Sequence, residues 1–425
     1  MVNVASIFST LGNPNSLVPL AVKDISATAG MTASSFVTGK EEGQDRFIDE
    51  VGTQIIWLFG IPGFKWLFDK TVFKAYGMDS EFDVRNLKDK DVFVKIKQFA
   101  PDEKIQKSIE KIGKKQGLFK NIALYKFLVA TTLTIGTYIG LTRAKQAYTA
   151  NKIEKNLIKE YNDKKQKENK EQNNLENPSF KGIGDVAKTF AFSPVKNMWI
   201  LDGAITAERL SDSRTQQEFI GYGIKEASTL CFMYYAGGKI QEYFEKRASE
   251  KYNKSIGLDA RVIENGSVKN AFENGSIVNS LEEFKKANTS DASLYEFLHK
   301  CPDNEVIKTA KTSDIIKLYK NTDKIDTRKY IDLEEVKSTA NKLEKLYEQF
   351  NTAIKKGETS EQFFKGVTKL KRHSILMNIG SCIFALGIVT PLIMLAKRFS
   401  SKDDAEFKTK SDIRNKLIEE GKIKA

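Results

Sequence analysis

Histidine and cysteine are scarce in this chain of 425 residues, which holds two histidines and three cysteines. Neither His299 nor His373 has the neighbours of a zinc site, and no H-E-x-x-H or G-x-S-x-G motif occurs. Three cysteines cannot all pair with one another, and two of them lie in apolar runs, as buried thiols commonly do. We therefore expect no catalytic residues, no metal site, no cofactor and no enzymatic activity.

Arginine is also scarce, supplying eleven of the 68 basic side chains in a chain with a formal net charge of +13. Proteins that read nucleic acids favour arginine for bidentate contacts, so this lysine excess argues against a nucleic-acid partner. A lysine-rich chain with apolar stretches is more typical of a protein on an anionic lipid surface. The N-terminus lacks a basic stretch before its apolar residues, and we expect no signal peptide.

Two long apolar runs are present in this charged background. Residues 374–396 contain 23 positions without a charged side chain, and residues 121–142 form a second run with Lys126 near its beginning. About 20 apolar residues suffice for a helix to cross a bilayer. We therefore predict an all-α integral membrane protein with a span at each run; buried helices of a soluble domain are the alternative. Pro391 should kink its helix without ending it.

Two shorter apolar segments, 47–68 and 224–244, are harder to interpret. In the first, the sequence QIIWLFGIPGFKWLF is too short to span a bilayer and is interrupted by Gly60, Pro62 and Gly63. Backbone groups at membrane depth must be hydrogen-bonded, which leaves three structures. The segment lies flat at the interface as an amphipathic helix, or it is re-entrant with a turn at the glycines and proline, or it extends into a tilted full span.

The two halves of the chain resemble each other around these segments. A shift of 176 positions aligns Ile48 with Ile224, Glu50 with Glu226, Thr53 with Thr229, Phe68 with Phe244 and Lys70 with Lys246. A shift of 178 aligns Asp24 with Asp202. Each half also has an acidic entry, a short apolar run, a lysine-rich stretch and a long apolar run in the same order. We interpret the halves as an internal duplication.

The aligned polar residues are the candidate functional residues. Transporters built from repeats place a substrate or ion site where interrupted helices occupy corresponding positions. Under this hypothesis the site consists of two acidic pairs and a threonine pair: Glu50 and Glu226, Asp24 and Asp202, and Thr53 and Thr229. The alternative, which the sequence favours, places each glutamate in the first turn of an interfacial helix, where it complements the helix dipole and faces water.

The predicted domain order comprises a first membrane half (1–150), a polar linker (151–187) that begins as a solvated helix, the start of the second half (188–246), an inserted helical domain (247–373), the second span (374–396) and a basic polar tail (397–425). In the inserted domain, Asn-Gly pairs at 265–266 and 274–275 indicate either a small β-hairpin or a polar loop. A heptad pattern over 332–356 predicts a helix that packs on its own domain or on a partner.

No motif identifies a molecular activity. Because polar regions outweigh the apolar ones, we predict first a non-enzymatic membrane anchor or scaffold with basic soluble regions. The alternative is a small-solute or ion transporter or channel built on the internal repeat. The expected partners are the lipid bilayer and, through residues 332–356, a protein or a second copy of the chain. The lysine and asparagine bias favours a bacterial inner membrane.

Overall fold

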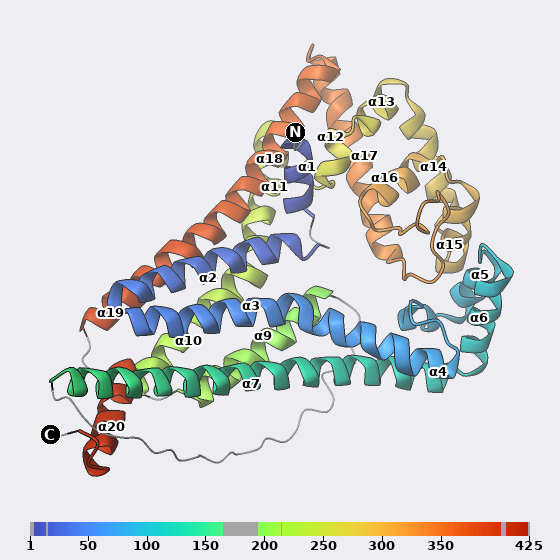
Figure 1. The fold of residues 1–425 in the computed structure, drawn as a ribbon. Helices are drawn as coiled ribbons and strands as arrows, with labels where there is room; N and C mark the ends of the chain where they lie inside the picture. The colour runs from blue at the N-terminus through green and yellow to red at the C-terminus, as the bar shows by residue number, and fades with distance from the viewer. Residues whose placement is uncertain (1–3, 14–15, 165–193, 214, 401–404, 424–425) are drawn as a thin grey trace. The chain divides into compact units, whose positions relative to one another are not determined.

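The computed structural model describes residues 4–13, 16–164, 194–213, 215–400 and 405–423, and its regular elements are helices (Figure 1). In chain order they are α1 (Val4–Leu11), α2 (Val18–Thr38), α3 (Lys40–Phe68), η1 (Asp69–Phe73), α4 (Lys74–Tyr76), η2 (Val84–Leu87), α5 (Lys90–Gln98), α6 (Glu103–Lys114), α7 (Gln116–Lys164), α9 (Pro194–Ser211), α10 (Gln216–Leu230), η3 (Cys231–Ala236), α11 (Gly237–Tyr252), α12 (Ala260–Glu264), α13 (Ser267–Glu273), α14 (Ser276–Ala287), α15 (Asp291–Lys300), α16 (Glu305–Thr312), α17 (Leu333–Lys355), α18 (Ser360–Phe384), η4 (Ala385–Val389), α19 (Thr390–Ser400) and α20 (Ala405–Glu419). The described residues hold one isolated β-bridge, between Leu318 and Ile325, and no strand. The prediction of an all-α chain is confirmed.

The chain divides into two compact units that do not follow the predicted halves. Unit 1 comprises Met1–Leu20, Trp66–Lys126 and Ala236–Ser381, and unit 2 comprises Ala21–Lys65, Phe127–Tyr235 and Cys382–Ala425. The boundaries fall inside α2, α3, α7, η3 and α18, so each of these elements contributes residues to both units.

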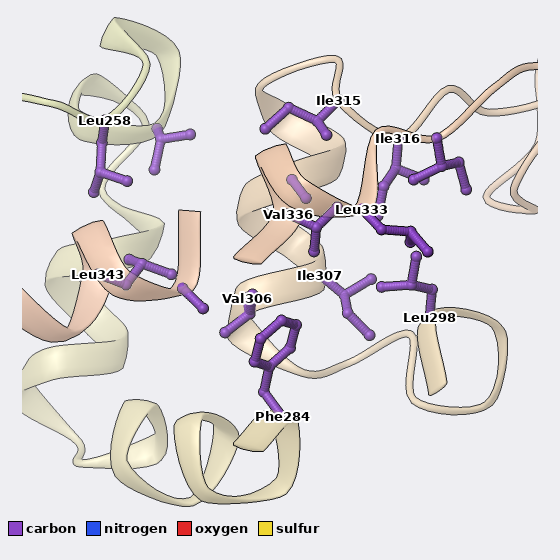
Figure 2. Close-up of a cluster of buried hydrophobic side chains, with 14 of the residues drawn as sticks. Leu258, Phe284, Leu298, Val306, Ile307, Ile315, Ile316, Leu333, Val336 and Leu343 are labelled. Atoms are coloured by element: carbon purple, nitrogen blue, oxygen red, sulfur yellow. The ribbon is translucent and has the colours of Figure 1, made fainter. Parts of the chain in front are cut away.

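Unit 1 is built around one apolar core. Its centre is formed by α14, α15, α16 and α17, whose aliphatic and aromatic side chains interdigitate (Figure 2). Val306, Ile307 and Val336 are completely buried there. The seam of α17 supplies Leu333, Val336, Ala340, Leu343 and Phe350 to this core, while Ile354 at its end is 41% exposed. The heptad pattern of residues 332–356 therefore packs within its own unit.

The Asn-Gly pairs do not form a β-hairpin. They separate the short helices α12, α13 and α14, and Gly266 and Gly275 precede their helices with φ angles of 75° and 73°. The Asn265 Oδ1 atom accepts a hydrogen bond from the Ser267 amide at 3.0 Å, which starts the next helix instead of a return strand. The hairpin interpretation was wrong because a left-handed glycine after asparagine serves helix entry as well as a hairpin turn.

Two described helical stretches are long and apolar enough to cross a membrane, and they contain both predicted spans. They are Gln116–Tyr161 in α7 and Ser360–Lys397, which runs through α18, η4 and α19. In each stretch 33% of the apolar window is buried inside the structure. The second stretch continues through Pro391, as predicted. The π-helical turn η4 precedes this proline, and Thr390 Oγ1 donates to the carbonyl oxygen of Ala385 at 3.0 Å.

The short apolar segments are not interrupted. α3 continues through Gly60, Pro62 and Gly63 to Phe68, and the second segment lies in an unbroken helical stretch of α10, η3 and α11. A re-entrant turn at these residues is therefore absent, and of the three alternatives this one was wrong. Gly60 has a packing role instead, because a Cβ atom there would lie 2.7 Å from Cγ2 of Thr134 in α7.

The start of the predicted linker is helical, as expected, and the predicted polar tail also contains a helix, α20. α7 extends to Lys164, which covers the first part of the predicted linker; residues 165–193 lie outside the described residues. Ile153 and Leu157 near the end of α7 pack against Leu417 and Ile423, the first of which lies in α20. The end of α7 and α20 thus pack on each other through apolar side chains within unit 2.

Unit 2 differs from unit 1 in the number of charged side chains that it buries. Among its described residues, eight charged side chains are buried: Lys23, Arg46, Asp49, Glu50, Lys145, Arg209, Lys225 and Glu226. Large apolar side chains are exposed, and examples are Ile55, Phe59, Leu133, Phe384, Leu392 and Phe399. In unit 1 only two charged side chains, those of Asp326 and Lys371, are buried in the described part.

Helices in unit 2 approach closely at small residues. α2 meets η4 where a Cβ atom on Gly30 would lie 2.2 Å from the carbonyl oxygen of Gly387. α3 and α7 run side by side (Figure 1), and a Cβ atom on Gly52 would lie 2.5 Å from Cδ2 of Leu141. Such contacts of small residues are typical of helix packing in membranes, where van der Waals contact replaces the hydrophobic effect.

Gly30→Ala should destabilise unit 2 by about 1–3 kcal/mol, because the new methyl group would collide with backbone that cannot rotate away. Gly136→Ala is the matched control, since this exposed helical glycine of α7 has open space around its Cβ position. The control should be neutral or stabilising by up to about 1 kcal/mol. Thermal unfolding in detergent measures both, and equal effects would contradict the close approach at Gly30.

Unit 1 contains a partly buried histidine, His299, whose pKa lies below its ordinary value. The ring of His299 stacks on Phe99 with centroids 4.5 Å apart, and its Nε2 atom is buried without a hydrogen-bond partner. Burial, assisted by the positive charge of Lys311, lowers the pKa of His299 to about 4. In the unfolded chain this pKa is about 6.5.

As the pH falls from about 6.5 to about 4, the unfolded chain therefore binds a proton that the folded chain excludes. We expect the unfolding free energy of unit 1 to fall by up to about 3 kcal/mol across this window. Hydrogen exchange of α15 amides in the whole protein should report this loss. His299→Phe should remove it, and His373→Gln, at an exposed position, should retain it. An identical pH dependence in wild type and His299→Phe would refute this assignment.

Candidate functional site

The candidate site begins with a charged face on α3. Asp45, Arg46, Asp49, Glu50 and Thr53 lie along one side of the helix, because Asp49 is four residues from Asp45 and from Thr53, and Glu50 is four from Arg46 and three from Thr53. This side faces the interior of unit 2, where Asp49 is 1% exposed and Glu50 is 4% exposed. Glu50 lies well inside α3 and away from water, so the interpretation of the glutamates as solvated first-turn residues was wrong.

Arg209 of α9 is the most connected residue of the site. Its guanidinium pairs with Glu226 of α10 and lies 3.3 Å from Oδ2 of Asp49. Its Nε atom donates to the Tyr138 hydroxyl of α7 at 2.8 Å, and Nη2 donates to Thr53 Oγ1 at 3.2 Å. This single side chain therefore links α9 with α3, α7 and α10.

Lys225 connects the two glutamates of the predicted pair. Its ammonium donates to both carboxylate oxygens of Glu50, at 2.7 and 2.9 Å, and lies 3.2 Å from Glu226. The glutamates aligned by the 176-residue shift thus share one lysine. Burying a carboxylate in a protein interior is costly unless an opposite charge and hydrogen bonds compensate it.

The remaining charges complete a balanced network. Arg46 lies 3.7 Å from Asp49 and 3.5 Å from Glu50, and Lys145 of α7 lies 3.5 Å from Asp49 and 3.6 Å from Asp45. Among the described residues of this network, four cations thus meet four carboxylates. Burial alone would raise the pKa of Asp49, but Arg209, Lys145 and Arg46 outweigh it and lower that pKa below its ordinary range.

A small cavity of about 30 Å³ lies beside this network in unit 2. We call it the aspartate cavity, and its lining consists of Asp24, Thr28, Glu50, Thr53, Gln54, Trp57, Asp202, Ile205, Arg209, Lys225, Glu226 and Thr229. All six residues selected from the sequence line it. The structure therefore brings both acidic pairs and the threonine pair together at one place. A cavity of this size holds one or two water molecules.

Asp24 and Asp202 receive hydrogen bonds from neutral side chains, and the charge of Lys225 also acts on Asp24. Asp24 Oδ2 accepts a hydrogen bond from Gln54 Nε2 at 2.7 Å, and Asp202 Oδ2 accepts one from the Tyr234 hydroxyl of η3 at 2.5 Å. Asp24 lies on α2 and Asp202 lies on α9, and both helices are outside the two candidate spans. Burial raises the pKa of Asp24 to about 6 and that of Asp202 to about 7.

A second polar cavity, of about 10 Å³, is also bordered by Arg209. Its lining includes Asp49, Tyr138, Lys145, Glu208 and Tyr222. Arg209 thus takes part in the walls of both cavities. Sequence analysis missed Arg209, Lys225, Arg46 and Lys145, although the spacing of charges on α3 was a signal that they required partners.

The described residues contain no group of three or more histidine, cysteine, aspartate or glutamate side chains that could hold a metal ion. Both histidines belong to unit 1, whereas the charged network and the aspartate cavity belong to unit 2. No protein-family model, curated protein or solved structure matches the chain. The functional argument therefore depends on the geometry of this site.

The Lys225–Glu50 pair can be tested as a double-mutant cycle. Lys225→Met and Glu50→Gln should each destabilise the protein by about 3–5 kcal/mol, because each leaves a buried charge without its main partner. The double variant keeps the network neutral and should recover most of this loss. Thermal or chemical unfolding in detergent measures the cycle, with the exposed Glu160→Gln as control. Additive losses in the double variant would show that the two side chains do not interact.

Proposed function

We propose that this chain is an integral membrane protein whose unit 2 conducts or transports a small ion or solute. Two observations support a lipid environment. The candidate spans in α7 and in α18 to α19 leave two thirds of their apolar windows unburied. Unit 2 also exposes large apolar side chains and buries charged ones, the distribution that lipid as solvent favours. By composition, we propose a bacterial inner membrane.

The observation that carries a permeation function is the aspartate cavity. It lies within the helical part of unit 2 and combines four carboxylates with Arg209 and Lys225. The lining comes from α2, α3, α9 and α10, of which α3 packs on α7, α2 on η4 and α10 on α19. Ionisable groups buried beside membrane spans are costly, and they typically mark substrate or ion pathways. An ion-pair network of this kind contributes little net stability compared with apolar packing, so stability alone gives no reason for it.

The size of the cavity restricts the permeating species. At about 30 Å³ it accommodates water, a proton or a small ion and excludes larger solutes in this conformation. The second cavity at Arg209 extends the polar lining from Glu226 towards Lys145. Arg209 lines both cavities. A change in its ion pairs would therefore open or close the passage between them.

A membrane anchor or scaffold is the second candidate function. The observation that favours it is the core of unit 1, in which forty apolar residues of the described part are buried. Such a unit can present a surface to a partner whether or not unit 2 moves an ion. Because the seam of α17 is used inside this core, a partner would bind elsewhere on unit 1.

Flux through purified protein in liposomes distinguishes the two functions. Wild-type protein should dissipate an imposed gradient of protons, sodium, potassium or chloride, followed with an ion-sensitive dye inside the vesicles. The charge-balanced double variant Glu50→Gln/Lys225→Met should reduce the rate to that of empty vesicles, while Glu160→Gln should not change it. If wild type inserts into the vesicles and moves none of these ions, the permeation function fails and the anchor remains.

A further inference from the structure

Residues 219–238, which lie in α10, η3 and the first turn of α11, have the length of a membrane span. These 20 positions extend about 30 Å along a helix, which is the thickness of the hydrocarbon core. The segment contains two charged residues, Lys225 and Glu226, and they are only 4% and 5% exposed. Their charges are paired with Glu50 and Arg209. Both residues lower the mean hydropathy of the segment, although neither of them faces outward.

The outward face of this segment carries no charge. Its exposed positions are Phe219, Ile220, Ala227, Cys231, Tyr235 and Gly238. Ile220, Ala227, Cys231 and Tyr235 are separated by seven, four and four residues, so they lie along one side of the helix. Phe219 is 49% exposed and Tyr235 is 64% exposed. Lipid acyl chains would cover such a face, and an aromatic residue near each end suits the two membrane interfaces.

The same segment lies beside the second candidate span and runs antiparallel to it. A Cβ atom on Gly221 would lie 2.8 Å from Cε of Met394 in α19. Near the other end of the segment, Sγ of Cys382 in α18 donates to the carbonyl oxygen of Phe232 at 3.2 Å. Residue numbers thus rise along the segment while they fall along its neighbour. A helix with this direction carries the chain back across a membrane that α18 to α19 crosses outward.

The path of the chain requires such a return. In the core of unit 1, Phe99 of α5 stacks on His299 of α15, and Lys95 pairs with Glu296 at 2.5 Å. The helix α5 precedes the candidate span in α7, and α15 lies between the two candidate spans. A bilayer cannot divide one apolar core, so α5 and α15 lie on the same side of it. If α7 crosses the membrane, the chain must therefore cross an odd number of further times before α15.

We propose that residues 219–238 form a third transmembrane span, whose uncharged face binds lipid acyl chains and along which the chain returns to the side of α5 and α15. This inference rests on the proposed function, from which it takes the membrane. It also extends that function, because Lys225 and Glu226 then lie at membrane depth together with their partners Glu50 and Arg209. Ionisable residues of membrane spans typically face the bundle interior and pair with one another.

The crossing is tested by labelling single cysteines in sealed membrane vesicles with a membrane-impermeant maleimide. The background replaces the native thiols by Cys231→Ser, Cys301→Ser and Cys382→Ala, and four exposed positions receive one cysteine each: Lys107→Cys, Glu160→Cys, Ser211→Cys and Lys251→Cys. The variants at 107 and 251 should react from one side of the membrane, and those at 160 and 211 from the other. Reaction of the variants at 211 and 251 from the same side would overturn the span.

The native Cys231 thiol tests the lipid contact without this background. In Cys301→Ser/Cys382→Ala, a nitroxide on Cys231 should collide often with dissolved oxygen and rarely with an aqueous nickel chelate, because it lies in lipid. The same label at Glu160→Cys, with Cys231→Ser added, should show the opposite preference. Equal access of the nickel chelate to both labels would overturn the proposal. A label on Cys231 that neither probe reaches would show that a second copy covers this face, and would overturn lipid as its partner.

Failure of this span can be distinguished from failure of the proposed function. Release of the chain from membranes by alkaline carbonate, or reaction of the variants at 107 and 160 from the same side, would overturn the membrane environment and the third span together. A retained chain in which only the variants at 211 and 251 share a side would overturn the third span alone. The expected labelling pattern without ion flux in liposomes would refute permeation and support the span.

Discussion

The structure of unit 2 depends on one constraint, that a charge removed from water must meet an opposite charge. Eight charged side chains are buried in this unit, and Arg209 and Lys225 join the acids of α3 and α10 into one network. Each ion pair restricts the rotation of a helix about its axis, since turning α3 would move Glu50 away from Lys225. The network therefore specifies the arrangement of helices more than it stabilises them.

The fold class and both long apolar helices could be predicted from the sequence because length and hydropathy are local properties. The continuation of the helix through Gly60 and Pro62 could not be predicted. Both residues interrupt a helix in isolation, yet α3 continues through them, since Gly60 lets Thr134 of α7 approach and tertiary contacts outweigh propensity. The Asn-Gly pairs show the same limit. Their left-handed backbone was predictable, but whether a helix or a strand follows depends on the core of α14 to α17.

The candidate site was predictable in part. The six polar residues selected by aligning the halves line one cavity, although the sequence favoured solvent exposure for the glutamates. Exposure was favoured because neither glutamate lies within a long apolar run of its own segment. The cations that permit burial, Arg209 and Lys225, lie 159 and 175 positions from Glu50 along the chain, so no local pattern connects them. Only the spacing of charges along α3 pointed to such partners.

Under the duplication hypothesis, the two glutamates can coexist because the halves differ at one aligned position. α3 begins at Lys40 and α10 at Gln216, positions 176 apart, and the same offset relates Glu50 to Glu226 and Asp49 to Lys225. Two identical copies would gather four acids from these positions at one site and repel each other. An aspartate in one half and a lysine in the other convert this repulsion into attraction, and Lys225 contacts both glutamates. Asp24 and Asp202 are aligned acids without such a change, and neutral side chains supply their hydrogen bonds, from Gln54 and Tyr234.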